Sequence, residues 1–204
     1  RRQGATQGRV FISSLRLVST SWAPQDDRLT VSFISRYNDA AYASDYFALS
    51  NRSVAQKIYG SGSGSDDVSE MEEFALRLAY DSLATTDAAI LRKFPQGFDS
   101  SYYRALALWI NTRSYSTGDI VTVSVGSGEK DTLNFTVPLQ GSSWQKLKLN
   151  FHSPNSVTGY PDLRRLSFLR LTVTGAASGE LWLNNCYMEE PIAATGEAWC
   201  AEAS

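Results

Sequence analysis

Few side chains in this sequence have the types and spacing that catalysis requires. Nucleophilic catalysis needs a base held beside the nucleophile. The only histidine, His152, follows a strand-like segment, and no Gly-x-Ser-x-Gly turn presents a serine to it. Paired carboxylates could serve a glycosidase or lyase, but each pair here consists of adjacent residues, which point to opposite faces of a strand. The pairs are Asp26-Asp27, Asp66-Asp67, Glu72-Glu73 and Glu189-Glu190. We therefore expect no catalytic residues and no enzyme.

Ligands for metals and phosphates are equally scarce. Cys186 and Cys200 form no CxxC pair, and with one histidine they fall short of the roughly three or four ligands of a zinc site. The two cysteines fit either one disulfide between the tail and the last strand or two thiols. The glycine turns at 118 and 126–128 do not precede a helix, so no phosphate loop is expected. The sequence predicts no metal site and no cofactor.

Recognition by aromatic side chains is the chemistry that remains. Sugar rings present apolar C–H faces that stack on tryptophan and tyrosine, while amide and charged groups meet their hydroxyl edges. Within 105–110, three branched apolar residues share one strand face, and Trp109 shares the other with Ala105 and Ala107. We expect these alanines to leave room above the sheet. The predicted ligand-binding residues are Trp109, Asn111, Arg113, Tyr102 and Tyr115.

A plainer interpretation of Trp109 stays open beside this one. An exposed tryptophan leaves a costly apolar patch, so a loop or helix of the chain itself could cover it in a second small core. The segment that ends at Tyr59 is one such cover. Trp144 and Trp182 start or end predicted strands, and we expect them to pack at the edge of the sandwich.

The elements that must position these residues are strands. Apolar and polar side chains alternate in short segments, and turns divide the segments every 8–12 residues or so, as in all-β sandwiches. Helical periodicity is confined to single turns within 38–47 and, equally well a loop, 99–104. We predict two antiparallel sheets packed face to face. The predicted strands lie around 10–17, 29–33, 74–80, 105–110, 120–125, 133–137, 147–151, 166–173 and 181–183, and the predicted core contains Leu76, Leu78, Leu106, Leu108, Ile110, Leu147, Leu149 and Leu171.

One segment departs from this pattern. Residues Gly60 to Ser65 repeat Gly-Ser three times, which is the composition of a flexible linker, natural or engineered. We divide the chain into an N-terminal β segment over 1–59 that completes the sandwich, the linker over 60–65, a jelly-roll core over 66–192 and a loose tail over 193–204.

Composition limits the partners. The 204 residues carry a net charge of −2 and no long run of Lys or Arg, so nucleic acid is not an expected partner. No apolar run approaches the roughly 20 residues that a membrane helix needs. The first eight residues lack the apolar stretch of a signal peptide.

From Phe74 onward the chain resembles the jelly-roll carbohydrate-binding modules and their galactose-binding-like relatives. The matching segments follow the family's order: 75–81, 94–102, 105–110, 143–147 and 178–185. The resemblance implies an all-β, antiparallel jelly-roll sandwich. It also implies a non-catalytic binding module for carbohydrate that works in the extracellular space, in the periplasm or at the cell surface. A β-sandwich hydrolase or lyase is the enzyme alternative.

The closing strand departs from this family at its calcium position. The family usually has an acidic residue there, and this chain has Asn184 and Asn185. Calcium prefers several carboxylate oxygens, and Asp66, Asp67 and Glu189 could contribute them. A structural calcium therefore stays open.

A fainter likeness implies a different function. Tyr160-Pro161-Asp162-Leu163, together with 181–185 and 9–17, is similar to repeated segments of the giant outer-membrane translocon protein of the type 9 secretion system. It implies a structural or protein-interaction domain of a bacterial cell-envelope or secretion protein. The expected partner is thus a carbohydrate or, alternatively, an envelope protein.

Overall fold

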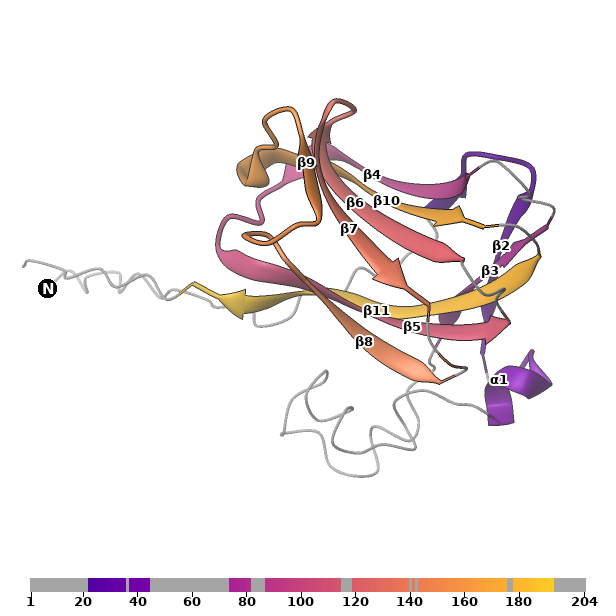
Figure 1. Cartoon of the computed structure of the whole chain (residues 1–204). Helices are drawn as coiled ribbons and strands as arrows, with labels where there is room; N and C mark the ends of the chain where they lie inside the picture. Colours follow the sequence, from indigo (N-terminus) through magenta and orange to yellow (C-terminus); the bar gives the residue numbers. More distant parts are fainter. Residues whose placement is uncertain are drawn as a thin grey trace, which may run out of the picture.

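Two antiparallel sheets pack face to face in the computed structural model, which describes residues 22–35, 37–44, 74–81, 87–114, 119–139, 141, 143–175 and 178–192 (Figure 1). The six-stranded sheet has the order β1-β4-β10-β6-β7-β9, and the five-stranded sheet has the order β2-β3-β11-β5-β8. The predicted antiparallel two-sheet sandwich is confirmed.

The strands of the six-stranded sheet are β1 (Trp22–Pro24), β4 (Ala88–Phe98), β6 (Ile120–Gly128), β7 (Asp131–Pro138), β9 (Ser156–Thr158) and β10 (Leu166–Thr174). Those of the five-stranded sheet are β2 (Leu29–Ile34), β3 (Ala75–Tyr80), β5 (Tyr103–Ser114), β8 (Trp144–Asn150) and β11 (Gly179–Pro191). A short helix, α1 (Ala40–Ser44), and a 3₁₀ turn, η2 (Leu163–Arg165), complete the described elements.

The main core lies between the sheets because each strand turns its apolar alternate residues toward the other sheet. On β5 these are Leu106, Leu108 and Ile110, which meet valines and leucines of β6 and β10 in one buried cluster. All eight predicted core residues belong to or pack against this cluster. Seven are buried, and Leu147 is half-buried against it.

The strand β4 was not among the predicted elements, because Pro95 and Gly97 give its second half the composition of a loop. Proline and glycine normally mark an edge, a bulge or a close approach in a strand. Here β4 pairs with β10 up to Lys93 and again at Phe98, with a register shift between, so both residues lie where the ladder is interrupted. Gly97 has a φ of +72°, which favours glycine.

Of the two predicted helical turns, one is present. The α1 helix falls within 38–47, and the Asp39 side chain accepts a hydrogen bond of 2.9 Å from the Tyr42 N–H in its first turn. The segment 99–104 instead turns into β5, where the Asp99 side chain accepts from the Ser101 N–H at 2.9 Å. Residues 99–102 therefore form a loop, which was the second interpretation of this segment.

The N-terminal segment contributes β1 to an edge of one sheet and β2 to an edge of the other. The predicted strands around 10–17, the Gly-Ser linker and the tail lie outside the described residues, so the division into segments stays a prediction. Cys186 is half-buried against the main core, and Cys200 also lies outside the described residues. No described helix is long and apolar enough to cross a membrane.

Candidate functional site

The outer face of the five-stranded sheet, which points away from the main core, carries three of the five predicted site residues. Along β5, Leu106 and Leu108 lie in the main core, and the intervening alternation places Trp109, Asn111 and Arg113 on the opposite face. Trp109 therefore lies on the face opposite the main core, as predicted. We call this surface the outer face.

Neighbouring strands place further side chains beside these residues. The rows across the sheet, taken in the order β11, β5 and β8, are Asn184–Trp109–Lys146 and Trp182–Asn111–Trp144. Residues in such rows have their side chains on the same face and within contact distance. Two adjacent regions of different character result, one around Trp182 and one around Trp109.

The region around Trp182 is closed by the helix. Tyr42 of α1 lies edge-on against Trp182, with ring centroids 5.2 Å apart and planes at 64°, and the Trp144 centroid is 6.3 Å from that of Trp182. Tyr42 and Trp182 are fully buried in a second small core with Ile34 and Ala75. Figure 1 shows α1 on this side of the sheet. We call this region the helix-covered half.

Polar contacts fix Trp182 from two sides. Its indole N–H donates to Glu180 Oε1 at 2.6 Å, and Glu180 in turn accepts from Arg77 at 2.6 Å. The Arg113 guanidinium lies 4.5 Å from the centroid of the Trp182 ring, within the range of a cation–π contact. Arg113 is thus engaged in holding this small core, and Asn111 beside it is fully buried.

The second small core that the sequence left open does exist, but it forms around Trp182 rather than Trp109. The expectation that Trp182 packs at the edge of the sandwich is wrong, because β11 is the central strand of its sheet. Trp144 does lie on an edge strand, although on the outer face, where it packs against the buried cluster of Tyr42 and Trp182.

No helix among the described residues lies over the region around Trp109, and we call this region the open half. Trp109 is half-buried. Beside it Lys146 makes an ion pair with Glu189, and its ammonium nitrogen lies 5.6 Å from the centroid of the Tyr187 ring. Burial alone would lower the pKa of Lys146, but hydrogen bonds to Glu189 and Tyr187 outweigh it and hold that pKa above its usual range. The open half is thus an aromatic and charged surface.

The space expected above Ala105 and Ala107 is not there. Both alanines are fully buried. Their neighbours in register on β11 are Glu189 and Tyr187, and Lys148 of β8 lies opposite Ala107 on the other side. Longer side chains on both flanks close over a small residue, so an alanine on an outer face need not mark a hollow.

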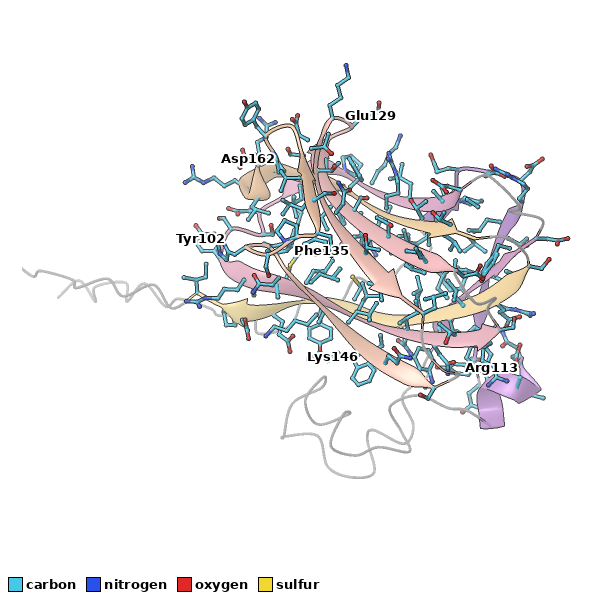
Figure 2. All side chains as sticks on the ribbon, in the orientation of Figure 1. Tyr102, Arg113, Glu129, Phe135, Lys146 and Asp162 are labelled. Atoms are coloured by element: carbon cyan, nitrogen blue, oxygen red, sulfur yellow. The ribbon has the colours of Figure 1, made fainter. Side chains whose placement is uncertain are left out.

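The two remaining predicted site residues do not join this surface. Tyr102 is 64% exposed in the turn before β5, and its carbonyl accepts a hydrogen bond of 2.7 Å from the Ile192 N–H. Figure 2 shows Tyr102 and Arg113 at opposite ends of the molecule, as a strand rise of roughly 3.4 Å per residue requires. Tyr115 lies outside the described residues.

The sequence did not single out Tyr187, Lys146 or Asn184 for this surface. A signal was available in β11, where Trp182 and Asn184 alternate with the buried Leu181 and Leu183. It fails beyond Asn184, because a register shift between Asn184 and Tyr187 resets the alternation. No local pattern in the sequence predicts that Tyr42 contacts Trp182.

A hollow of about 380 Å³ lies at the far end of β2 and β3. Its one aromatic lining residue, Tyr80, is buried and donates to Asp119 at 2.8 Å. Burial, and then this hydrogen bond, raise the pKa of Tyr80 above its usual range. With no exposed ring, the hollow offers no stacking platform; it is lined by Asp27, Arg28, Thr30, Ala79, Tyr80 and Asp81.

Among the described residues, no cluster of three or more His, Cys, Asp or Glu side chains is placed to hold a metal ion. Glu189, one of the oxygen donors considered for calcium, is ion-paired with Lys146. Asp66 and Asp67 lie outside the described residues, so a structural calcium ion stays an open alternative.

Comparison with known proteins establishes the fold. No family model and no curated protein matches the sequence. Among solved structures, the chain is similar to a family 11 carbohydrate-binding module of Clostridium thermocellum in complex with a β-1,3-1,4-mixed-linked tetrasaccharide. That match has a TM-score of 0.54 and 13% identity, and it covers 90% of this chain and 99% of the other.

Two further structures agree. The family 11 module of a cellulosomal cellulase of the same organism matches with a TM-score of 0.54 and 13% identity, over 92% of this chain and 100% of that one. An exo-β-agarase matches with a TM-score of 0.51 and 13% identity, over 87% of this chain but only 24% of its own. The predicted jelly-roll sandwich, of the type found in carbohydrate-binding modules, is confirmed. The likeness to the translocon protein stays a prediction.

Proposed function

We propose that this chain is a non-catalytic carbohydrate-binding module that works outside the cytoplasm, with its ligand lying across the open half of the outer face. One observation carries the proposal: Trp109 is half-buried on that face, whereas the neighbouring Trp182 is sealed by α1. The fold supports it as well, since the matches to two carbohydrate-binding modules extend over nearly the whole of both chains.

The side chains of the open half suit a sugar ring. The Trp109 ring can stack on the apolar face of a pyranose, and Tyr187 offers a second ring two positions along the neighbouring ladder. Asn184, in register with Trp109, is buried and its amide donates to the Tyr42 hydroxyl at 3.4 Å, so the polar groups for sugar hydroxyls come from the rim instead. Lys146 and Glu189 add a donor and an acceptor at the rim.

The same region supports a binding role rather than hydrolysis. Glycosidases use two carboxyl groups that flank one bond. Here Glu189 and Glu190 are each ion-paired, with Lys146 and Lys148 respectively. The Lys148 ammonium holds the pKa of Glu190 below its usual range, which is unlike a general acid. His152 is exposed beyond β8, and its backbone N–H donates to Asn150 Oδ1 at 2.9 Å.

A protein-interaction role is the second candidate, and Tyr160 favours it. This tyrosine is 94% exposed, yet its backbone N–H is held by Asp131 Oδ1 at 2.9 Å. Two residues on, the Asp162 N–H donates to Ser127 Oγ at 2.9 Å. An exposed aromatic ring on a backbone fixed by hydrogen bonds is typical of an interface anchor.

A glycan array followed by calorimetric titration with the best ligand tests the first candidate. We expect Trp109→Ala to weaken binding about tenfold or more, because it removes the stacking surface. Tyr160→Ala is the matched control, since it removes an exposed ring from the loop that follows β9, away from the open half. No binding to any glycan would overturn the proposal in favour of the second candidate. Loss of binding with Tyr160→Ala but not with Trp109→Ala would overturn the assignment of the ligand to the open half.

A further inference from the structure

In the part of the chain that the structure describes, the two sheets have four edge strands, and three of them carry features that discourage pairing with another chain. In the six-stranded sheet, β1 has three residues and ends in Pro24, and β9 also has three residues. In the five-stranded sheet, β8 carries Lys146 and Lys148. Short length, proline and lysine are the devices by which natural sheets protect their edges.

The fourth edge, β2, has none of these devices. Its six residues, Leu29–Ile34, contain neither charge nor proline. β3 pairs with it on one side, and no described strand lies on the other. Exposed aromatic rings gather at the end where β2 leaves the sheet and β3 enters it: Phe33 is 43% exposed, Tyr37 68% and Phe74 43%. Such an edge is a template for a further strand.

We propose that β2 is a dimerisation edge, at which two copies of this chain join their β2 strands antiparallel about a twofold axis through Val31. The two five-stranded sheets then continue into each other. The proposal names a second copy because the strand is self-complementary, which is what a twofold interface requires.

The self-complementarity follows from the alternation along β2. In the register centred on Val31, Thr30 lies opposite the partner's Ser32, and Leu29 lies opposite the partner's Phe33. Leu29 and Val31 face the main core, whereas Thr30 and Ser32 are exposed on the outer face. Polar residues thus meet polar ones and apolar residues meet apolar ones, with no like charges opposed.

The axis of such a dimer is perpendicular to the sheet, so both outer faces point to the same side. Two copies of the open half would then face one surface. If that half binds a polysaccharide, the dimer engages two sites of one chain or fibre at once, and avidity exceeds the affinity of either site. The dimer itself rests on the β2 edge alone and is tested without any ligand.

Sedimentation of the whole chain over a wide concentration range provides the first measurement. We expect the molar mass to rise from that of one chain to that of two. The variant Thr30→Lys with Ser32→Lys sets lysines opposite each other twice across the axis, and it is expected to weaken dimerisation about tenfold or more. Both positions are exposed, so at concentrations where both chains are monomeric its melting temperature should match that of the unaltered chain.

A charge-swapped variant tests the register. Thr30→Lys with Ser32→Glu places opposite charges across the axis, so it should restore the dimer. Thr158→Lys, in the β9 edge, is the control that should leave the molar mass unchanged. Three results would each overturn the proposal. They are an unaltered chain that stays monomeric at every concentration, a lysine variant that still dimerises, and a charge-swapped variant that does not dimerise. A monomer destabilised by the lysines would instead assign the β2 edge to another segment of this chain.

Discussion

The helix-covered half and the open half of the outer face are built from the same three strands, yet they differ in what can reach them. Each has a tryptophan at its centre, Trp182 on β11 and Trp109 on β5, and each has a basic side chain against an aromatic ring. The difference lies in the short helix. Tyr42 packs on the first tryptophan, which is fully buried, whereas the second is half-buried with no described helix over it.

The difference teaches that a tryptophan on an outer face is not by itself a binding platform. Trp182 contributes to folding because its ring and its N–H are both satisfied within the chain. Trp109 lies on the same face and is half-buried, with no described helix over it. Comparing substitutions in the two halves therefore separates stability from recognition.

The largest effect is expected for Trp182→Ala. Removing a fully buried tryptophan leaves a cavity beneath α1 and deprives Arg113 of its ring, so we expect a loss of about 3–5 kcal/mol in the free energy of unfolding. Chemical denaturation monitored by far-ultraviolet circular dichroism measures it. A loss below about 1 kcal/mol would show that the helix-covered half is no core, and the contrast between the halves would disappear.

Trp109→Ala should cost distinctly less stability, because Trp109 is half-buried whereas Trp182 is fully buried. We expect under about 2 kcal/mol. The same denaturation experiment measures this loss beside that of Trp182→Ala. Equal losses for the two variants would make Trp109 a core residue and would sink the proposed binding face.

Arg113→Gln sharpens the comparison within the helix-covered half. Glutamine keeps a polar side chain of similar reach but lacks the charge that lies over the Trp182 ring. The expected loss is about 0.5–2 kcal/mol, measured as a fall in the midpoint of denaturation. If stability is unchanged while glycan affinity falls, Arg113 acts on the ligand, as the sequence first suggested, and not on the core.

The smallest effect concerns pH and the open half. The pKa of Lys146 is raised in the folded chain, so the stability it contributes is complete below the unfolded pKa, about 10.4. That contribution is lost as the pH rises through the folded pKa. Because the pair with Glu189 is about one-third exposed, the contribution is well under 1 kcal/mol.

Unfolding midpoints of the unaltered chain and of Lys146→Met, compared from neutral to alkaline pH, measure this term. The two curves should lie a constant distance apart up to about pH 10 and converge above it. Curves that stay parallel throughout would show that the Lys146–Glu189 pair contributes nothing to folding.

Much of the fold could be predicted because strand alternation is a local property. Leu106, Leu108 and Ile110 fixed which face of β5 enters the core, and they thereby placed Trp109 on the other face. The strand β4 escaped prediction because Pro95 and Gly97, tolerated where its ladder is interrupted, mimic a loop. The candidate site was predicted less well, since nearness in sequence grouped Tyr102 with Arg113 although β5 separates them by its full length.

The sequence by itself determined the class of fold and, for strands with unbroken alternation such as β5, the face that is buried. Only the tertiary structure decided which tryptophan is covered. Tyr42 and Trp182 meet because α1 folds back over a strand from the far end of the chain, and no periodicity links residues so distant. Likewise, the alanines beside Trp109 are closed over by side chains of neighbouring strands. Strand alternation determines the face of the sheet on which a side chain lies, and the packing of neighbouring elements determines whether a ligand can reach it.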